Sequence, residues 1–371
     1  MCGVHHKVPS IYPLGLMHLR ITDAAKVRAL YNWVSHNIRY VGMYMNLSGF
    51  VPHSAEGILR NRYGDCKDHV ALLEALLRAV DIDSSPVLVN SGAAYELPPV
   101  ASSATFNHAI TYVPSLDLFL DSTAQFAPMG TLPPSVQGKP ALIAATGKIK
   151  TTPASSAESD GTDTTTHLTL ALDGSVKGSS KSLMKGSAEV NSRHAQFSMA
   201  NEDPLTISRR ILAAERESGS GRITPNEPSN LNIPWVVEAS FELEPLINLP
   251  GPSAFVVPVG IAPGSINLLA RQTLRDDRQF PYRCQDESHS QTTYITLPPD
   301  VKVDRLPEDV AFEADGLQYR ASYKQTGSTI QVQRYYSAQR GKSVCTAHDE
   351  VVRSQLLKTL RRDLRAQVFV R

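Results

Sequence analysis

The sequence predicts an α+β fold, in which helices precede an antiparallel sheet, followed by a second region built mostly of β-strands. Three observations support this prediction. Apolar residues recur at helical spacing before residue 80, short strand-like runs follow up to residue 121, and apolar and polar residues alternate in much of the chain after residue 167. With 371 residues, of which 42% are hydrophobic, the chain is long enough for two domains with separate cores.

The composition excludes several classes of function. Lys and Arg number 37 against 36 Asp and Glu, a net charge of +1, so no strong overall field attracts nucleic acid and no such partner is expected. No apolar run approaches the roughly 18 residues that a transmembrane helix needs. Residues 1–10 lack the apolar core of a signal peptide. The compartment stays open, because the sequence is compatible with a cytoplasmic protein and with a fragment of an exported one.

The first predicted domain, residues 1–150, begins with two helices. Thr22 or Asp23 can cap the first helix, whose apolar residues recur every three or four positions: Val27, Leu30, Val34 and Ile38. The second helix begins near Cys66 and carries its apolar residues on one face: Val70, Leu73, Leu76, Leu77 and Val80. Strand-like runs follow at 86–90, 108–113 and 118–121. This order, helices before strands, predicts an α+β domain.

Residues 151–166, with the sequence TTPASSAESDGTDTTT, contain almost no large apolar residue and are predicted to form a linker or an exposed loop. The second predicted domain, residues 167–371, is mostly β with two helices. One helix is expected near 204–217. The other lies near the end of the chain, with an apolar stripe on the sheet and four basic residues facing water: Lys358, Arg361, Arg362 and Arg365.

One cysteine stands in a setting that favours chemistry. Cys66 lies in the segment YGDCKD at the start of the second helix, where unpaired backbone N–H groups and the helix dipole favour a thiolate and can hold an oxyanion. The carboxylates of Asp65 and Asp68 oppose the thiolate, so a histidine partner is required. Taken alone, a free cysteine is most often an inert buried residue. The polar neighbours of Cys66 favour the interpretation as a nucleophile.

A histidine and an aspartate follow on two neighbouring strand-like runs. His108 begins one run and Asp121 ends the next, which predicts a hairpin with both side chains on one sheet. Adjacent strands lie about 4.8 Å apart, so the imidazole and the carboxylate can form a hydrogen bond that fixes the histidine tautomer. Each residue alone is more simply a strand-edge histidine or a turn-forming aspartate. Together with Cys66 they predict a base and its orienting group.

The sequence shows no pattern of residues that would predict a metal site or a cofactor site. The cysteines Cys2, Cys66, Cys284 and Cys345 show none of the short paired spacings of zinc sites or disulfide frameworks, and Cys66 is expected to stay reduced. A zinc site built from Cys66, Asp68 and His108 lacks a fourth ligand. No glycine-rich phosphate loop occurs. The remaining histidines in question are expected at the surface: His5, His6 and His18 near the terminus, and His69 on the second helix.

Three segments carry a resemblance to a known family: RYGDCKDHVALLEALLRAV, FNHAITYV and LFLDSTAQFAPMGTLP. Within residues 22–145 they resemble the transglutaminase-like superfamily, specifically the bacterial branch found with domain of unknown function 3857. The resemblance implies a papain-like α+β core, in which a cysteine-bearing helix packs on an antiparallel sheet. It also implies the catalytic triad Cys66, His108 and Asp121. Relatives often have Pro at the position of Ser122, a departure that concerns the turn more than the carboxylate.

The expected activity is thiol-dependent acyl transfer on a peptide or protein substrate, at peptide or glutamine-type amide bonds. Cys66 forms a thioester, which water resolves in a protease or amidase and an amine resolves in a transglutaminase. Hydrolysis is favoured because Glu56 and Glu96 are isolated and form no acidic cluster that would hold calcium or recruit an amine. Arylamine acetyltransferases share the order of the triad but match the GDCKD context less well. The alternative is a non-catalytic peptide-binding scaffold of the same fold.

Overall fold

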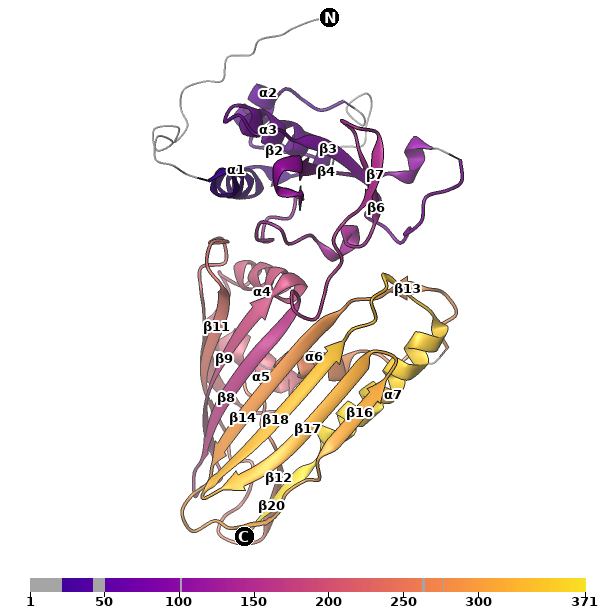
Figure 1. Cartoon of the computed structure of the whole chain (residues 1–371). Coiled ribbons are helices and arrows are strands. Elements are labelled where there is room, and N and C mark those ends of the chain that lie inside the picture. Colours follow the sequence, from indigo (N-terminus) through magenta and orange to yellow (C-terminus); the bar gives the residue numbers. More distant parts are fainter. Residues whose placement is uncertain (1–21, 43–50, 101, 262–263, 276) are drawn as a thin grey trace, which may run out of the picture. The chain divides into compact units, whose positions relative to one another are not determined.

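The computed structural model describes residues 22–42, 51–100, 102–261, 264–275 and 277–371. The chain forms two compact units, Met1–Ala154 and Ser155–Arg371, which Figure 1 shows in full. The mixed helices and sheets confirm the predicted fold class. The expectations about Cys2, His5, His6 and His18 concern residues outside the described ranges.

The first unit combines three helices with a five-stranded antiparallel sheet in the order β5-β4-β3-β6-β7. The helices are α1 (Asp23–Asn37), α2 (Ala55–Asn61) and α3 (Cys66–Arg78). The strands are β3 (Ser85–Val89), β4 (His108–Val113), β5 (Leu118–Leu120), β6 (Pro140–Ile143) and β7 (Lys148–Thr151). Short 3-10 turns lie at η3 (Ser103–Thr105), η4 (Pro114–Leu116) and η5 (Pro134–Val136). Two further strands, β1 (Arg39–Tyr40) and β2 (Tyr63–Gly64), pair in parallel.

The two faces of this sheet pack against different apolar clusters. On the helical side, α1, α2 and α3 share a core with Val113 of β4 and Leu120 of β5. A second core forms around Val87 of β3 and Ile110 of β4. Thr22 caps α1 as predicted, since its side chain accepts a hydrogen bond from the backbone N–H of Ala25. The helix that begins at Cys66 is therefore held between other helices and the sheet.

The second unit is built on an eight-stranded sheet in the order β10-β11-β9-β8-β14-β18-β17-β16. Its strands are β8 (Gly161–Leu170), β9 (Val176–Lys185), β10 (Gly219–Pro225), β11 (Trp235–Leu243), β14 (Glu287–Thr296), β16 (Val310–Ala314), β17 (Leu317–Thr326) and β18 (Thr329–Ala338). Neighbouring strands are antiparallel except for β8 and β14, which pair in parallel. The sheet therefore consists of two antiparallel halves joined by one parallel seam.

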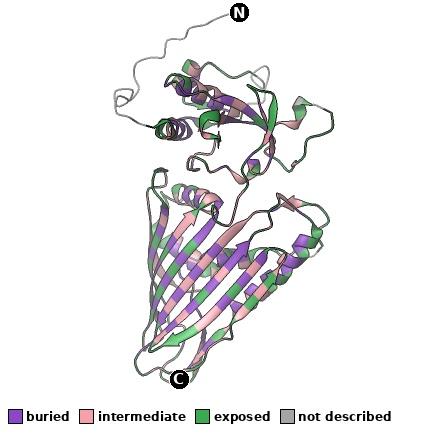
Figure 2. Cartoon of the chain, viewed as in Figure 1, coloured by how far each residue is buried: buried purple, intermediate pink, exposed green. Residues whose placement is uncertain are grey.

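Helices and smaller sheets complete the second unit. The helices are α4 (Gly186–Ser198), α5 (Pro204–Ala214), α6 (Ser265–Arg271) and α7 (Ala347–Asp363), of which α5, α6 and α7 lie behind the large sheet in Figure 1. A small antiparallel sheet has the order β12 (Ser253–Val256), β20 (Gln367–Val370) and β15 (Val303–Arg305), and β13 (Tyr282–Arg283) pairs with β19 (Val344–Cys345). Burial alternates along the large strands in Figure 2, as the sequence pattern predicts. No helix of the described residues has the length and apolar content to span a bilayer.

The prediction of a linker or exposed loop over residues 151–166 is wrong at both ends of that segment. Thr151 belongs to β7, and residues 161–166 open β8, where Thr162, Thr164 and Thr166 are buried. Threonine is β-branched and favours strands, and its buried hydroxyl can be satisfied by a neighbour. The Thr164 hydroxyl lies 3.0 Å from the Ser182 hydroxyl on β9. A search for large apolar residues cannot detect such a strand.

Helices α4 and α6 were also missed, since only two helices were predicted after residue 166. The buried residues of α4 are polar, namely Ser187, Glu189 and Arg193, so no apolar stripe marks this helix. Arg193 is held by Glu189 and stacks over the Trp235 ring. In α7, the expectation that Arg361 faces water is wrong, because its Nε donates to the Ala270 carbonyl at 2.7 Å.

The sequence spacing of the cysteines did not indicate a disulfide, but the structure contains one. Cys284 and Cys345 form a disulfide across a sequence separation of 61 residues. The antiparallel pairing of β13 with β19 brings the two residues together, since Tyr282 lies opposite Cys345 and Arg283 opposite Val344. Sequence spacing cannot reveal a bond that tertiary pairing creates. Cys66 is the free cysteine of the described part of the chain.

A buried charge cluster anchors α7 to the large sheet. The Arg334 Nε on β18 lies 2.7 Å from Oδ2 of Asp363 at the end of α7. The hydroxyls of Tyr319 and Tyr323 on β17 donate to the two oxygens of the same carboxylate, at 2.6 and 2.7 Å. Because both charges are removed from water, each depends on the other for stabilisation.

We expect Asp363→Asn to lower the free energy of unfolding of the second unit by about 3–5 kcal/mol, because it leaves Arg334 charged and unpaired. Asp304→Asn is the matched control, since its ion pair with Arg371 is exposed and should contribute less than about 1 kcal/mol. Urea titration in a Trp33→Phe background, followed by Trp235 fluorescence, measures the second unit. Equal losses in the two variants would contradict the prediction.

Candidate active site

The site begins at the start of α3. Cys66 is its first helical residue, and Asp65 and Asp68 form a reciprocal capping box. The Asp65 N–H donates to Asp68 Oδ2 at 3.2 Å, and the Asp68 N–H donates to Asp65 Oδ1 at 3.4 Å. Lys67 forms an ion pair with Asp65. The first N–H groups of the helix have no acceptor within the helix, so they remain available near the thiol.

Asp68 also fixes the segments in front of the helix. Its carboxylate is fully buried and accepts a hydrogen bond from the His53 backbone N–H at 2.8 Å, while the His53 ring Nδ1 lies 3.1 Å away. Gly64 passes so close that an added Cβ would lie 2.5 Å from Asp68 Cβ. Glycine is therefore required at residue 64 for this approach, which explains the Gly in the motif.

The sheet brings the other two predicted residues together. His108 opens β4 and Asp121 directly follows β5, and the antiparallel pairing places Thr111 opposite Leu120, so both residues lie at one end of the hairpin. The His108 Nε2 lies 2.9 Å from Asp121 Oδ2. Cys66 lies close enough to the His108 ring to raise the pKa of the ring. Because Nε2 faces Asp121, Nδ1 is the ring nitrogen left for the thiol.

Asp121 is held as a buried carboxylate. Its Oδ1 accepts hydrogen bonds from the Thr123 N–H at 3.1 Å and from the Thr123 hydroxyl at 2.6 Å. Burial raises the pKa of Asp121, but the hydrogen bond and charge of His108 and the bonds from Thr123 lower it, and the net pKa lies below the ordinary value. The Tyr31 hydroxyl donates to the backbone carbonyls of Asp121 and Ala127, at 3.3 and 2.9 Å. Helix α1 therefore fixes the loop that carries the carboxylate.

The same environment favours a protonated histidine. Burial lowers the pKa of His108, but the hydrogen bonds to Asp121 and Cys66, together with the charges of both, raise it to about 10. Both partners stabilise the imidazolium only when they carry negative charge. The environment therefore favours the imidazolium form of His108, beside Cys66 and the Asp121 carboxylate.

His69 is a residue of this site that the sequence interpretation placed wrongly on the helix surface. Only 1% of its surface is exposed, and its Nδ1 lies 2.9 Å from the Ser122 carbonyl oxygen. Burial lowers the pKa of His69, which favours the neutral ring with Nδ1–H as the donor. This bond ties α3 to the residue after Asp121. Its position on the buried face, three residues after Cys66, is the signal that the sequence offered.

No group of three or more His, Cys, Asp and Glu residues in the described ranges is arranged to hold a metal ion. The position of Ser122, where relatives often have Pro, contributes a carbonyl to His69 and not a side chain to the triad. The loop at 43–50 lies outside the described residues.

Comparison with known proteins finds a family model that matches part of the first unit. Residues 17–113 match the family model of the transglutaminase-like superfamily, a match that includes Cys66 and His108 and ends before Asp121. No curated protein sequence matches the chain.

A solved structure resembles nearly the whole chain. A proposed protease from Parabacteroides distasonis is similar with a TM-score of 0.58 at 13% sequence identity. The similarity covers 96% of this chain and 54% of that protein, so this chain spans about half the length of its structural relative. At such identity the likeness concerns the fold alone. The finer assignment to the bacterial branch with domain of unknown function 3857 stays a prediction. The first unit therefore contains a region, residues 17–113, that is similar to the transglutaminase-like superfamily.

Proposed function

We propose that the protein is a thiol-dependent acyl-transfer enzyme that hydrolyses peptide or glutamine-type amide bonds. The observation that carries this proposal is the position of His108, which is hydrogen-bonded to Asp121 and interacts with Cys66, the first residue of α3. A nucleophile, a base in contact with it and a group that orients the base are the parts that such chemistry requires.

The proposed reaction has two halves. The Cys66 thiolate attacks the amide carbon, and backbone N–H groups at the start of α3 stabilise the oxyanion. The C–N bond then breaks as His108 gives its proton to the leaving amine, which produces a thioester. Neutral His108 next removes a proton from water, and the resulting hydroxide displaces Cys66 by forming a C–O bond. The acid is released, and the thiolate and the imidazolium are restored.

We predict that limiting iodoacetamide alkylates Cys66 first, since the thiolate is the reactive form and His108 stabilises it. Cys284 and Cys345 are disulfide-bonded and serve as internal references that should stay unlabelled without a reductant. Peptide mapping by mass spectrometry locates the adduct. His108→Ala should slow the labelling of Cys66 at neutral pH at least ten-fold; unchanged labelling in that variant would remove the role assigned to His108.

The alkaline limb of the kcat/KM profile should depend on Asp121. The pKa of His108 is raised, so the proton needed by the leaving amine is present at neutral pH and is lost as the pH rises toward about 10. Asp121→Asn should move that limb to lower pH by at least about 1 unit and reduce kcat by about 10²–10⁴-fold.

Asp117→Asn is the control for this experiment. Asp117 lies on the same hairpin, is exposed, and pairs with Lys150 and not with His108. Its profile should coincide with that of the wild type. An alkaline limb that stays in place in Asp121→Asn would show that another group donates the proton.

The competition between water and amines tests which acceptor resolves the thioester. We expect the acid to remain the main product of a peptide amide when a primary amine is titrated to low millimolar concentration at fixed pH. Water is abundant, and Glu56 and Glu96 are isolated acidic residues in the sequence that form no cluster to recruit an amine. Predominant amide product would instead favour a transglutaminase. No turnover of any acyl donor, together with peptide binding, would favour the non-catalytic scaffold.

A further inference from the structure

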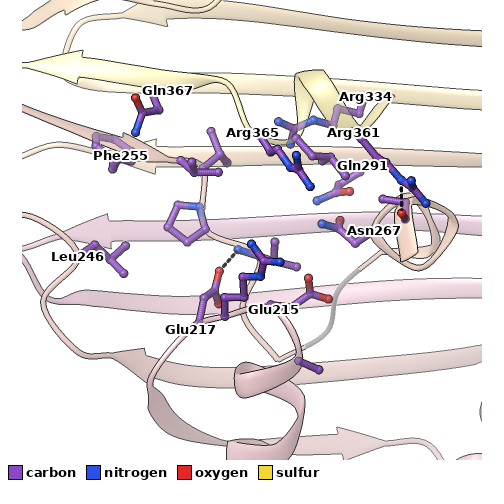
Figure 3. Close-up of a pocket in the computed structure, with 18 of the residues that line it drawn as sticks. Glu215, Glu217, Leu246, Phe255, Asn267, Gln291, Arg334, Arg361, Arg365 and Gln367 are labelled. Carbon is purple, nitrogen blue, oxygen red and sulfur yellow. Dashed lines mark hydrogen bonds between the residues drawn. The ribbon is translucent and has the colours of Figure 1, made fainter. Parts of the chain in front are cut away.

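The second unit contains a cavity of about 610 Å³ that is separate in sequence from the triad. Figure 3 shows it in close-up. Its walls come from the end of α5, from β12, and from α6 and the end of α7, while β14 and β18 supply its floor. Leu246 and Phe255 make one wall apolar. A cavity with apolar walls and a few converging polar groups is the usual form of a small-molecule site.

Two amide side chains that line this cavity are buried without partners. Asn267 on α6 is 5% exposed, and Gln291 on β14 is 4% exposed. The buried oxygens Asn267 Oδ1 and Gln291 Oε1 accept no hydrogen bond from any described residue. Leaving a buried polar group unsatisfied costs about 1–3 kcal/mol. Both residues line the cavity, and a ligand that donates hydrogen bonds is the partner that these oxygens lack.

Three arginines lie on one side of the cavity. Arg334 pairs directly across the sheet with Gln291, and its Nε and Nη2 are fixed by Asp363 and Tyr323. Arg361 is fixed by the carbonyls of Ala270 and Gln272. Figure 3 shows Arg365 next to these two. Arginine forks suit carboxylates and phosphates, and a fixed guanidinium loses little entropy on binding.

Acidic groups lie apart from these arginines. Glu217 accepts hydrogen bonds from the N–H groups of Val259 and Gly260, at 2.7 and 2.9 Å, and Glu215 pairs with Arg271. In Figure 3, Glu215 and Glu217 lie away from Arg361 and Arg365. Because Asp363 compensates Arg334 and Arg271 compensates Glu215, the charge offered to a ligand comes from Arg361 and Arg365 on one side and from Glu217 on another. Asn267 and Gln291 add hydrogen-bond acceptors.

We propose that this cavity binds a small dipolar carboxylate, of the class of α-amino acids and short peptides. The ligand carboxylate lies against the arginines, its N–H groups donate to Asn267 Oδ1 and Gln291 Oε1, and its ammonium end lies toward Glu217. An anion without N–H groups can pair with the arginines, but it offers no N–H donor to the two amide oxygens. This site goes beyond the proposed function, because it lies in the second unit and needs no group of the triad.

The test uses the full chain carrying Cys66→Ser, so that any turnover at the triad is removed. Isothermal titration with glycine, L-alanine, L-alanyl-L-alanine and tri-L-alanine measures binding. At least one of these should bind saturably with a stoichiometry near one. The C-terminal amide of the tightest ligand lacks the carboxylate and should bind at least ten-fold more weakly. Inorganic phosphate should also bind at least ten-fold more weakly.

Two variants locate the binding. Arg365→Gln changes an exposed residue, and Asn267→Leu keeps the size of the side chain while removing the unsatisfied amide; each should weaken binding at least five-fold. Arg362→Gln is the matched control, since Arg362 is an exposed arginine near the end of α7, three residues before Arg365, and does not line the cavity. Thermal unfolding confirms that each variant is folded.

Three results would overturn the proposal. They are the absence of saturable binding by all four probes, equal or tighter binding of phosphate, and binding that both Arg365→Gln and Asn267→Leu leave unchanged. A fourth result would also reject the proposed ligand class: normal binding by Asn267→Leu together with weakened binding by Arg365→Gln. The amide oxygens would then have no role in binding a ligand that donates hydrogen bonds.

Discussion

The carboxylate of Asp68 is the constraint on which the first unit depends. It closes the capping box at Asp65, accepts the backbone N–H of His53, and leaves no room for a Cβ at Gly64. One buried group therefore sets where α3 starts, how the chain enters it, and where the loop before α2 ends. A helix that began one residue later would rotate Cys66 by about 100° and take it away from His108.

Negative charge in the site is distributed over separate partners. Asp65 pairs with Lys67, Asp68 is bound by backbone N–H groups and by His53, and Asp121 is paired with His108. From the sequence, the first two carboxylates were expected to oppose a thiolate. In the folded protein each is compensated locally, so His108 can serve the sulfur and Asp121. In the folded protein, Asp65 and Asp68 therefore oppose a negative charge at Cys66 less than the sequence suggested.

Local patterns predicted the elements that carry the three candidate residues Cys66, His108 and Asp121. The apolar stripe of α3, the cap of α1 and the hairpin of β4 and β5 follow from spacing and turn chemistry. What spacing could not predict depends on partners distant in sequence. Thr164 is buried in β8 because Ser182 meets its hydroxyl, and Arg193 is buried because carbonyls near Pro228 and Ile233 surround it. The disulfide and His69 belong to the same class.

The parallel seam between β8 and β14 has a consequence for how the second unit is made. Gly161 pairs with Ser288, whereas β8 to β11 pair among themselves. During synthesis from the N-terminus, those four strands leave the ribosome with β8 as an open edge. That edge stays open until β14 emerges, and open edges are sites of intermolecular pairing. During this interval, pairing of β8 with β14 of the same chain competes with pairing of β8 with a strand of another chain.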